Sequence, residues 1–119
     1  IYSDDNLFMN GPEIFNFTIR NIPPLITEVL QKNNETIETI DYIIFHQANK
    51  YMLDYLRQKM KIPPEKFFNN MLETGNTVSA TIPIGICKAK ENGLIHKGSR
   101  ILLCGFGVGY SWGATVITL

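Results

Sequence analysis

A short apolar run, residues 42–45, is followed by a histidine and then almost at once by an amphipathic stretch. The run reads YIIF, and its β-branched and aromatic residues predict a buried strand. After His46, Asn49 precedes a segment whose apolar and charged residues fall on different helical faces, which predicts a helix capped by Asn49 and ending near Lys61. A buried strand joined this closely to an amphipathic helix indicates the α/β class.

The remaining segments extend this pattern into a single unit. Residues 13–31 predict a helix, with a kink or two abutting helices at Pro23-Pro24. Residues 77–92 are apolar almost all round, which predicts a helix covered on most sides. Residues 100–104 and 114–119 predict two strands, with GFGVGYSWG turning between them. We therefore expect one domain over residues 1–119, with layered helices on a mixed sheet and one buried helix.

Composition excludes several classes of function. Eleven basic and eleven acidic residues cancel, which argues against a nucleic-acid binder that works by phosphate neutralisation. No apolar stretch approaches the roughly 20 residues that span a bilayer. Cys87 and Cys104 offer no disulfide framework, which favours a reducing compartment. The chain starts with Ile1 rather than Met, so we expect it to be a piece of a longer protein.

Two polar residues are candidates for chemistry, each with a structural alternative. His46 stands at the carboxyl end of a predicted strand, where α/β folds place active sites, but it could equally be a satisfied core histidine. Asn76 lies between Gly75 and Thr77 and could simply hold a turn. The glycines of GFGVGYSWG match no dinucleotide fingerprint; they allow either close approach to a ligand or the tight turn of a hairpin.

Other candidate sites are weaker. Cys87 falls in the all-apolar helix and Cys104 has no visible partner that would activate it, so neither is a good nucleophile. The histidines and cysteines do not have metal-ligand spacing. Three cations recur at helical spacing and form either a solvated face or a dock for an acidic partner: Lys50, Arg57 and Lys61.

Taken in order, four motifs resemble the C-terminal half of β-ketoacyl-[acyl-carrier-protein] synthase III, of the thiolase-like superfamily. They are MNG followed by Phe15, then HQAN, then GNT, and then FGxGxxWG near the end. The resemblance covers nearly all 119 residues. It implies a condensing acyltransferase of fatty-acid or related lipid synthesis, which joins an acyl group from acyl-CoA to malonyl-carrier protein with loss of carbon dioxide.

The resemblance also implies a role for each candidate residue. His46 and Asn76 would be the two polar groups of the decarboxylation site, and both can donate to a thioester oxygen as charge develops there. The other assignments are an oxyanion loop (Phe106, Gly107, Val108, Gly109), a channel for the pantetheine arm (Gly11, Phe15, Asn49) and a carrier-protein dock (Lys50, Arg57, Lys61).

The resemblance further implies what lies outside this chain. The nucleophilic cysteine belongs to an N-terminal half, so the fragment alone should be inactive; the full enzyme would be a cytoplasmic homodimer that needs no cofactor besides its substrates. Phe45 and Tyr51 depart from the proline and arginine that the family commonly has at these positions. Two alternatives remain open: an acyltransferase that forms an ester or amide without decarboxylation, and a non-catalytic interaction module.

Overall fold

The chain folds around a three-stranded mixed sheet in the order β1-β2-β3. The computed structural model describes residues 8–107 and 109–119. Strand β1 (Tyr42–Phe45) pairs in parallel with β2 (Arg100–Gly107), which pairs antiparallel with β3 (Ser111–Thr118). The α-helices are α1 (Gly11–Lys32), α2 (Lys50–Lys59) and α3 (Thr81–Glu91), and two short 3-10 turns cover Pro64–Lys66 and Val78–Ala80.

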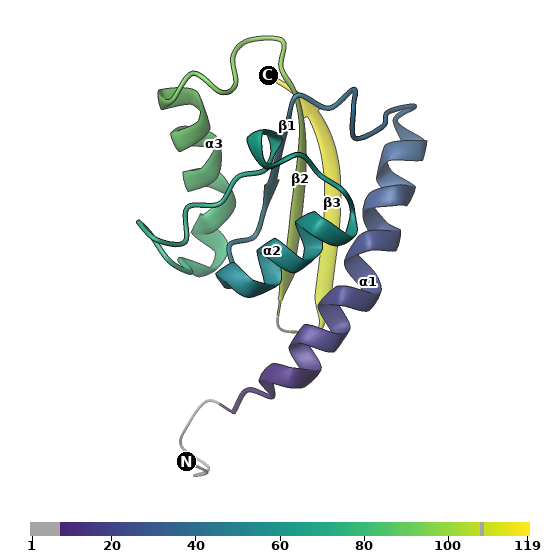
Figure 1. The fold of residues 1–119 in the computed structure, drawn as a ribbon, viewed down its shortest axis with the longest axis vertical. Helices are drawn as coiled ribbons and strands as arrows, with labels where there is room; N and C mark the ends of the chain where they lie inside the picture. The colour runs from purple at the N-terminus through teal and green to yellow at the C-terminus, as the bar shows by residue number, and fades with distance from the viewer. Residues whose placement is uncertain (1–7, 108) are drawn as a thin grey trace.

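The two faces of the sheet bury separate apolar clusters. Figure 1 shows α1 and α3 on opposite sides of the sheet. Because side chains alternate along a strand, Ile43 and Phe45 join the cluster under α1 and α2, whereas Tyr42 and Ile44 join the cluster under α3. The predicted strand at residues 42–45 is confirmed, and its apolar residues on both faces are explained by a helix layer on each side.

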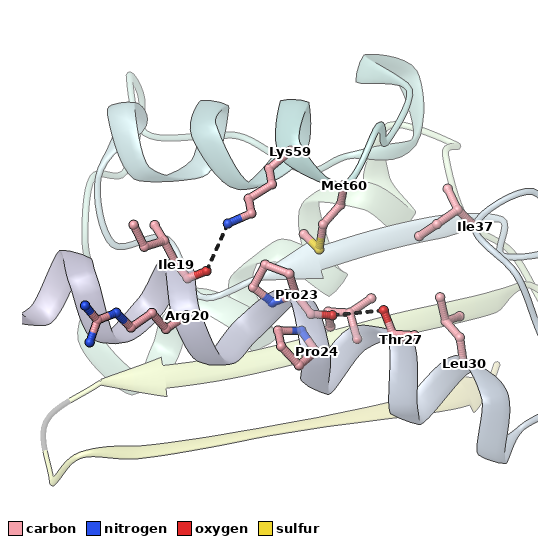
Figure 2. A pocket seen from close by; sticks show the side chains of 10 residues that line it. Ile19, Arg20, Pro23, Pro24, Thr27, Leu30, Ile37, Lys59 and Met60 are labelled. Atoms are coloured by element: carbon pink, nitrogen blue, oxygen red, sulfur yellow. Dashed lines mark hydrogen bonds between the residues drawn. The ribbon is translucent and has the colours of Figure 1, made fainter.

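Helix α1 is one continuous helix with both prolines inside it, so the alternative of two abutting helices is wrong. Proline has no N–H, so Pro23 leaves the carbonyl of Ile19 without its helical donor. The Lys59 ammonium of α2 lies 3.4 Å from that carbonyl, as Figure 2 shows. This contact crosses a groove of about 590 Å³ between the two helices. The neighbouring helix therefore supplies a hydrogen-bond donor to the carbonyl that has lost its helical donor at Pro23.

Helix α2 begins where the sequence predicts. The Asn49 side chain accepts a hydrogen bond from the Met52 N–H at 2.8 Å, which caps the helix. The helix ends at Lys59, two residues before the predicted end. The direct passage from β1 through residues 46–49 into α2 holds the HQAN segment at the carboxyl edge of the sheet.

Helix α3 is shorter than the predicted 77–92 segment and packs closely on β1. Its residues Thr81, Gly85 and Ala89 are buried, whereas Cys87 is exposed. A Cβ atom added to Gly85 would lie 2.8 Å from the Cγ2 methyl of Ile44, a distance that demands a shift of one group. The helix was predicted to be covered on most sides. It is buried on the face towards the sheet, whereas the face that carries Cys87 is exposed in this chain.

The two C-terminal strands are longer than predicted. Most of the GFGVGYSWG segment is paired, with Gly105 opposite Gly113 and Phe106 opposite Trp112. Between the two strands, the structure describes a turn at Gly109 and Tyr110. Across the described residues, no helix is both long and apolar enough to cross a membrane.

Candidate active site

His46 directly follows β1 and is fixed at three points. Its N–H donates to the Cys104 carbonyl at 2.8 Å, which extends the strand pairing by one residue. Its ring packs edge-on against Phe106, with 5.5 Å between centroids, and its Nδ1 lies 2.7 Å from Oγ1 of Thr81. Burial lowers the pKa of His46 below its ordinary value of 6.5, an effect that a backbone hydrogen bond with Val78 partly offsets. The imidazole is therefore neutral at pH 7.

Asn76 is held in one orientation by its own turn. The Val78 N–H donates to Oδ1 of Asn76 at 2.8 Å, and Nδ2 of Asn76 donates to the Ala48 carbonyl at 3.3 Å. Since the oxygen is committed to a backbone N–H, the amide nitrogen is the group presented to the HQAN segment. Val78 adopts φ of 56°, a left-handed conformation that is a genuine outlier for a β-branched residue.

His46 and Asn76, 30 residues apart in sequence, line the same cavity of about 730 Å³. Four more of the predicted residues line it too: Gly11, Asn49, Phe106 and Gly107. The cavity lies at the carboxyl end of β1, where the HQAN segment, the start of α3 and the β2–β3 hairpin meet. The predicted position of the site at this edge of the sheet agrees with this geometry.

Among the described residues, the remaining predicted positions lie outside the lining of this cavity. The Phe15 ring packs at a tilt against Tyr51 and edge-on against Tyr55, with centroids 5.7 and 5.6 Å away. Gly109 belongs to the turn beyond β2, and Val108 lies outside the described residues.

The three predicted docking cations lie along α2 and the turn that follows it. The Lys50 ammonium is paired with the Asp54 carboxylate at 2.6 Å, and Arg57 donates to the Ile62 carbonyl at 3.2 Å. Lys61 is exposed. Within α2, Asp54 therefore neutralises the charge of one of the three docking cations, Lys50.

Neither cysteine carries chemistry in this site. Cys104 is fully buried, and burial raises the pKa of its thiol to about 12; a thiol that stays protonated is a poor nucleophile. Cys87 lies on the exposed face of α3. Among the described residues, no group of three His, Cys, Asp or Glu side chains could hold a metal ion.

Sequence reasoning missed several residues that line the cavity. Thr81 is the most important because it touches His46, although the sequence assigned it to an apolar helix. The sequence did not distinguish it from Thr77 and Ser79, the two hydroxyl residues that precede it in the same segment. Others that line the cavity are Met9, Ile14, Met52, Val78, Ser79, Ile82, Ser111, Trp112 and Gly113.

The arrangement suits the stabilisation of negative charge on an oxygen atom. A neutral imidazole and an oriented carboxamide face one cavity, and such preorganised donors act strongly where water is excluded. No carboxylate lines the cavity among the described residues. The site can therefore hold an anionic oxygen without repulsion from a fixed negative charge.

Comparisons with known proteins agree with this geometry. Residues 30–119 match the family model described as 3-oxoacyl-[acyl-carrier-protein (ACP)] synthase III C terminal. The chain is 44% identical over 117 residues to a β-ketoacyl-[acyl-carrier-protein] synthase III from Clostridium perfringens, covering 98% of this chain and 36% of that protein.

Solved structures of similar proteins superpose closely on the chain. A 3-oxoacyl-(acyl-carrier-protein) synthase III matches with a TM-score of 0.94 and 43% identity, over 98% of this chain and 35% of the other. The synthase III from Thermus thermophilus matches with a TM-score of 0.93 and 35% identity, over 98% and 36%. The chain thus spans about a third of the length of the relatives it matches.

Proposed function

The chain belongs to the 3-oxoacyl-[acyl-carrier-protein] synthase III C-terminal family, and from this premise we propose that it forms one half of the active site of a condensing enzyme. The reaction joins an acyl group from acyl-CoA to malonyl-carrier protein. A further part of the enzyme supplies the cysteine that carries the acyl group, and the chain by itself is inactive. The observation that carries the proposal is the convergence of His46 and Asn76 on one cavity.

In this reaction His46 and Asn76 stabilise the product of decarboxylation. The bond to the malonyl carboxyl carbon breaks, carbon dioxide leaves, and the electron pair moves onto the thioester oxygen. The resulting enolate carbon attacks the acyl-enzyme carbonyl, and the cysteine leaves as a thiolate. An N–H from each side chain to the enolate oxygen lowers the barrier, and loss of one such donor costs on the order of 10²–10³ in rate.

The other cavity residues serve the substrate. Gly11 and Asn49 border the entrance beside α1 and α2, which suits the narrow pantetheine arm, with Phe15 behind them against Tyr51. Phe106 and the flanking glycines Gly107 and Gly109 shape the wall near the His46 ring, and the backbone N–H of Val108 is assigned as an oxyanion donor to the acyl-enzyme. Lys50, Arg57 and Lys61 are the carrier-protein dock.

The proposal extends to the whole enzyme. It acts in the cytoplasm as a homodimer and requires no cofactor beyond acyl-CoA and the malonyl-carrier protein. Membership of the family supports these assignments.

Intact-mass measurement on the full-length protein tests the function. Incubation with short acyl-CoAs should give a covalent acyl adduct that is discharged to a β-ketoacyl product only when malonyl-carrier protein is added. His46→Ala and Asn76→Ala should load normally and discharge on the order of 10²–10³ more slowly. Discharge without malonyl-carrier protein to an alcohol or amine would instead indicate an ester- or amide-forming acyltransferase. Absence of any adduct would leave a non-catalytic module.

A further inference from the structure

Gln47, the second residue of the HQAN segment, is a buried carboxamide that takes no part in the proposed reaction. It is 1% exposed. Its Nε2 donates to the carbonyl of Phe45 at 2.9 Å and to the carbonyl of Phe68 at 3.3 Å. Its Oε1 accepts from the Asn70 N–H at 3.0 Å. A carboxamide has two N–H donors and one acceptor oxygen, so all three of these groups are engaged.

The Gln47 side chain continues the sheet beyond the end of its backbone pairing. Phe67 forms an isolated parallel bridge with Ile43 of β1, and the Phe68 N–H donates to the Ile43 carbonyl at 2.9 Å. Strand β1 ends at Phe45. Beyond this point the Gln47 amide joins the two segments, because it donates to one carbonyl of each.

The segment after this pairing, residues 69–75, is a turn whose other hydrogen bonds are local. The Asn70 carbonyl accepts from the N–H and from the hydroxyl of Thr74, at 3.1 and 3.2 Å. Among the described residues, the bond from the Asn70 N–H to Gln47 is the only hydrogen bond between this turn and the rest of the chain. Gln47 therefore sets where the turn begins.

The turn leads into Asn76, which contacts the same HQAN segment. Its Nδ2 donates to the carbonyl of Ala48, the residue next to Gln47, at 3.3 Å. An amide nitrogen carries two protons, so the second can donate to a ligand in the cavity that Asn76 lines. We propose that Gln47 is a positioning residue, which holds the turn at Asn70 and thereby fixes the Asn76 amide relative to His46.

The contact at Gln47 is the stronger of the two that hold the turn. N–H donors to oxygen have a usual range of about 2.7–3.2 Å, and the contact between Asn76 and Ala48 lies just beyond it. The contact between Asn70 and Gln47, at 3.0 Å, lies within it and is made to a buried side chain. A misplacement of about 1 Å can cost on the order of 10²-fold in rate. This consequence for catalysis rests on the proposed function, whereas the placement of Asn76 rests on these contacts.

Amide hydrogen exchange on the full-length protein measures the placement directly. Two amides report it: the Asn70 N–H is bonded to Gln47, and the Val78 N–H donates to Oδ1 of Asn76 at 2.8 Å. Gln47→Met keeps the length of the side chain but removes its polar atoms. We expect both amides to exchange about 10-fold faster or more in this variant, and by a larger factor than the amides of β2.

Gln47→Glu is the conservative variant. Its carboxyl group keeps an acceptor for the Asn70 N–H, and burial beside two carbonyl oxygens favours the protonated form, which donates one hydrogen bond. Exchange at Asn70 and Val78 should therefore stay close to the native rate.

The matched control is Thr18→Val. Thr18 is also fully buried, and its hydroxyl donates to the Ile14 carbonyl at 2.8 Å within α1. This variant measures the effect of losing a buried side-chain hydrogen bond that does not involve the turn. Thr18→Val should leave the exchange at Val78 and the discharge rate unchanged.

Kinetics of the two half-reactions complete the test. Gln47→Met should load acyl groups normally but discharge them about 10- to 100-fold more slowly, and Gln47→Glu should restore most of the rate. In the Asn76→Ala background Gln47→Met should have little further effect on discharge, because the donor that it positions is already absent. In the His46→Ala background it should still slow discharge. A merely structural role would slow discharge equally in both backgrounds.

Two results would overturn the proposal. One is unchanged exchange at Val78 in Gln47→Met, and the other is a full further loss of discharge rate in the Asn76→Ala background. If Gln47→Met fails to fold, Thr74→Val replaces it, since it removes the hydroxyl that closes the turn on the Asn70 carbonyl and Thr74 is only half-buried. Thr74→Val should speed exchange at Val78 and slow discharge only where Asn76 is present, and native values would equally refute the proposal.

The two proposals can fail separately. Faster exchange at Val78 in Gln47→Met with no change in discharge confirms that Gln47 positions Asn76. The same result refutes the role of Asn76 as a donor in decarboxylation.

Discussion

Gly85→Ala tests whether close packing of α3 on β1 holds the candidate site together. In an open helix this change stabilises by about 1 kcal/mol, because glycine is a poor helix former. Here the new Cβ would lie 2.8 Å from Cγ2 of Ile44 and 3.1 Å from Cε1 of Phe68. Both neighbours are buried, at 0% and 6% exposure, so neither side chain can move out of the way into solvent.

The overpacking term outweighs the gain in helix propensity. Inserting a methyl group into a packed core costs about 1–3 kcal/mol, so after the gain of about 1 kcal/mol we expect Gly85→Ala to lower the free energy of unfolding by up to about 2 kcal/mol. Denaturant titration of the full-length protein measures this loss, and the slope of the unfolding free energy against denaturant concentration should stay unchanged. A stabilisation of about 1 kcal/mol, the value for an open helix, would refute the reasoning.

A double-mutant cycle identifies the clashing atom. Ile44→Leu removes the Cγ2 methyl while keeping side-chain volume, and such swaps usually cost less than about 1.5 kcal/mol. If the contact at 2.8 Å is the cause, Gly85→Ala should cost less in the Ile44→Leu background than in the native one. Strictly additive effects would mean that another contact resists the methyl group.

Three further outcomes follow from the described contacts. Burial lowers the pKa of His46 below 6.5, so as pH falls the unfolded chain binds a proton at this residue before the folded chain does. The free energy of unfolding, measured by denaturant titration at a series of pH values, should therefore fall as pH drops from about 6.5 through the lowered pKa. His46→Gln should remove this part of the pH dependence. Cys104, with a thiol pKa of about 12 and no exposure, should resist iodoacetamide in the native protein and react on unfolding, as mass spectrometry of the peptides will show; native labelling would contradict its burial. Asn49→Ala should lose about 1 kcal/mol through the lost cap on Met52, whereas Asn49→Ser should keep most of the stability, so an equal loss in both would exclude capping as the cause.

Local sequence patterns determined the elements that lead into the site. The apolar run at residues 42–45 is the observed strand, and Asn49 caps the helix that follows. Both depend on short-range physics: alternation of side chains along a strand, and the unpaired N–H groups of a first helical turn. The motif order also placed the chain in its family, which the family model confirms.

Long-range contacts decided what the local patterns could not. The two prolines predicted a kink or two abutting helices. Helix α1 is one continuous helix, and the ammonium of Lys59, 40 residues along the chain from Ile19, lies beside the Ile19 carbonyl. The glycine-rich segment predicted a turn, but pairing extends both strands into it. Local propensity is a weak prior that tertiary partners override.

The sequence by itself singled out His46 and Asn76 as candidates for chemistry, because they stand in recognisable local motifs. Only the tertiary structure decided how they are held. Thr81 reaches His46 across 35 residues, and it does so because Gly85 lets α3 approach β1. Such a contact leaves no periodic trace in the sequence, since it depends on how closely two elements pack rather than on the pattern within either one.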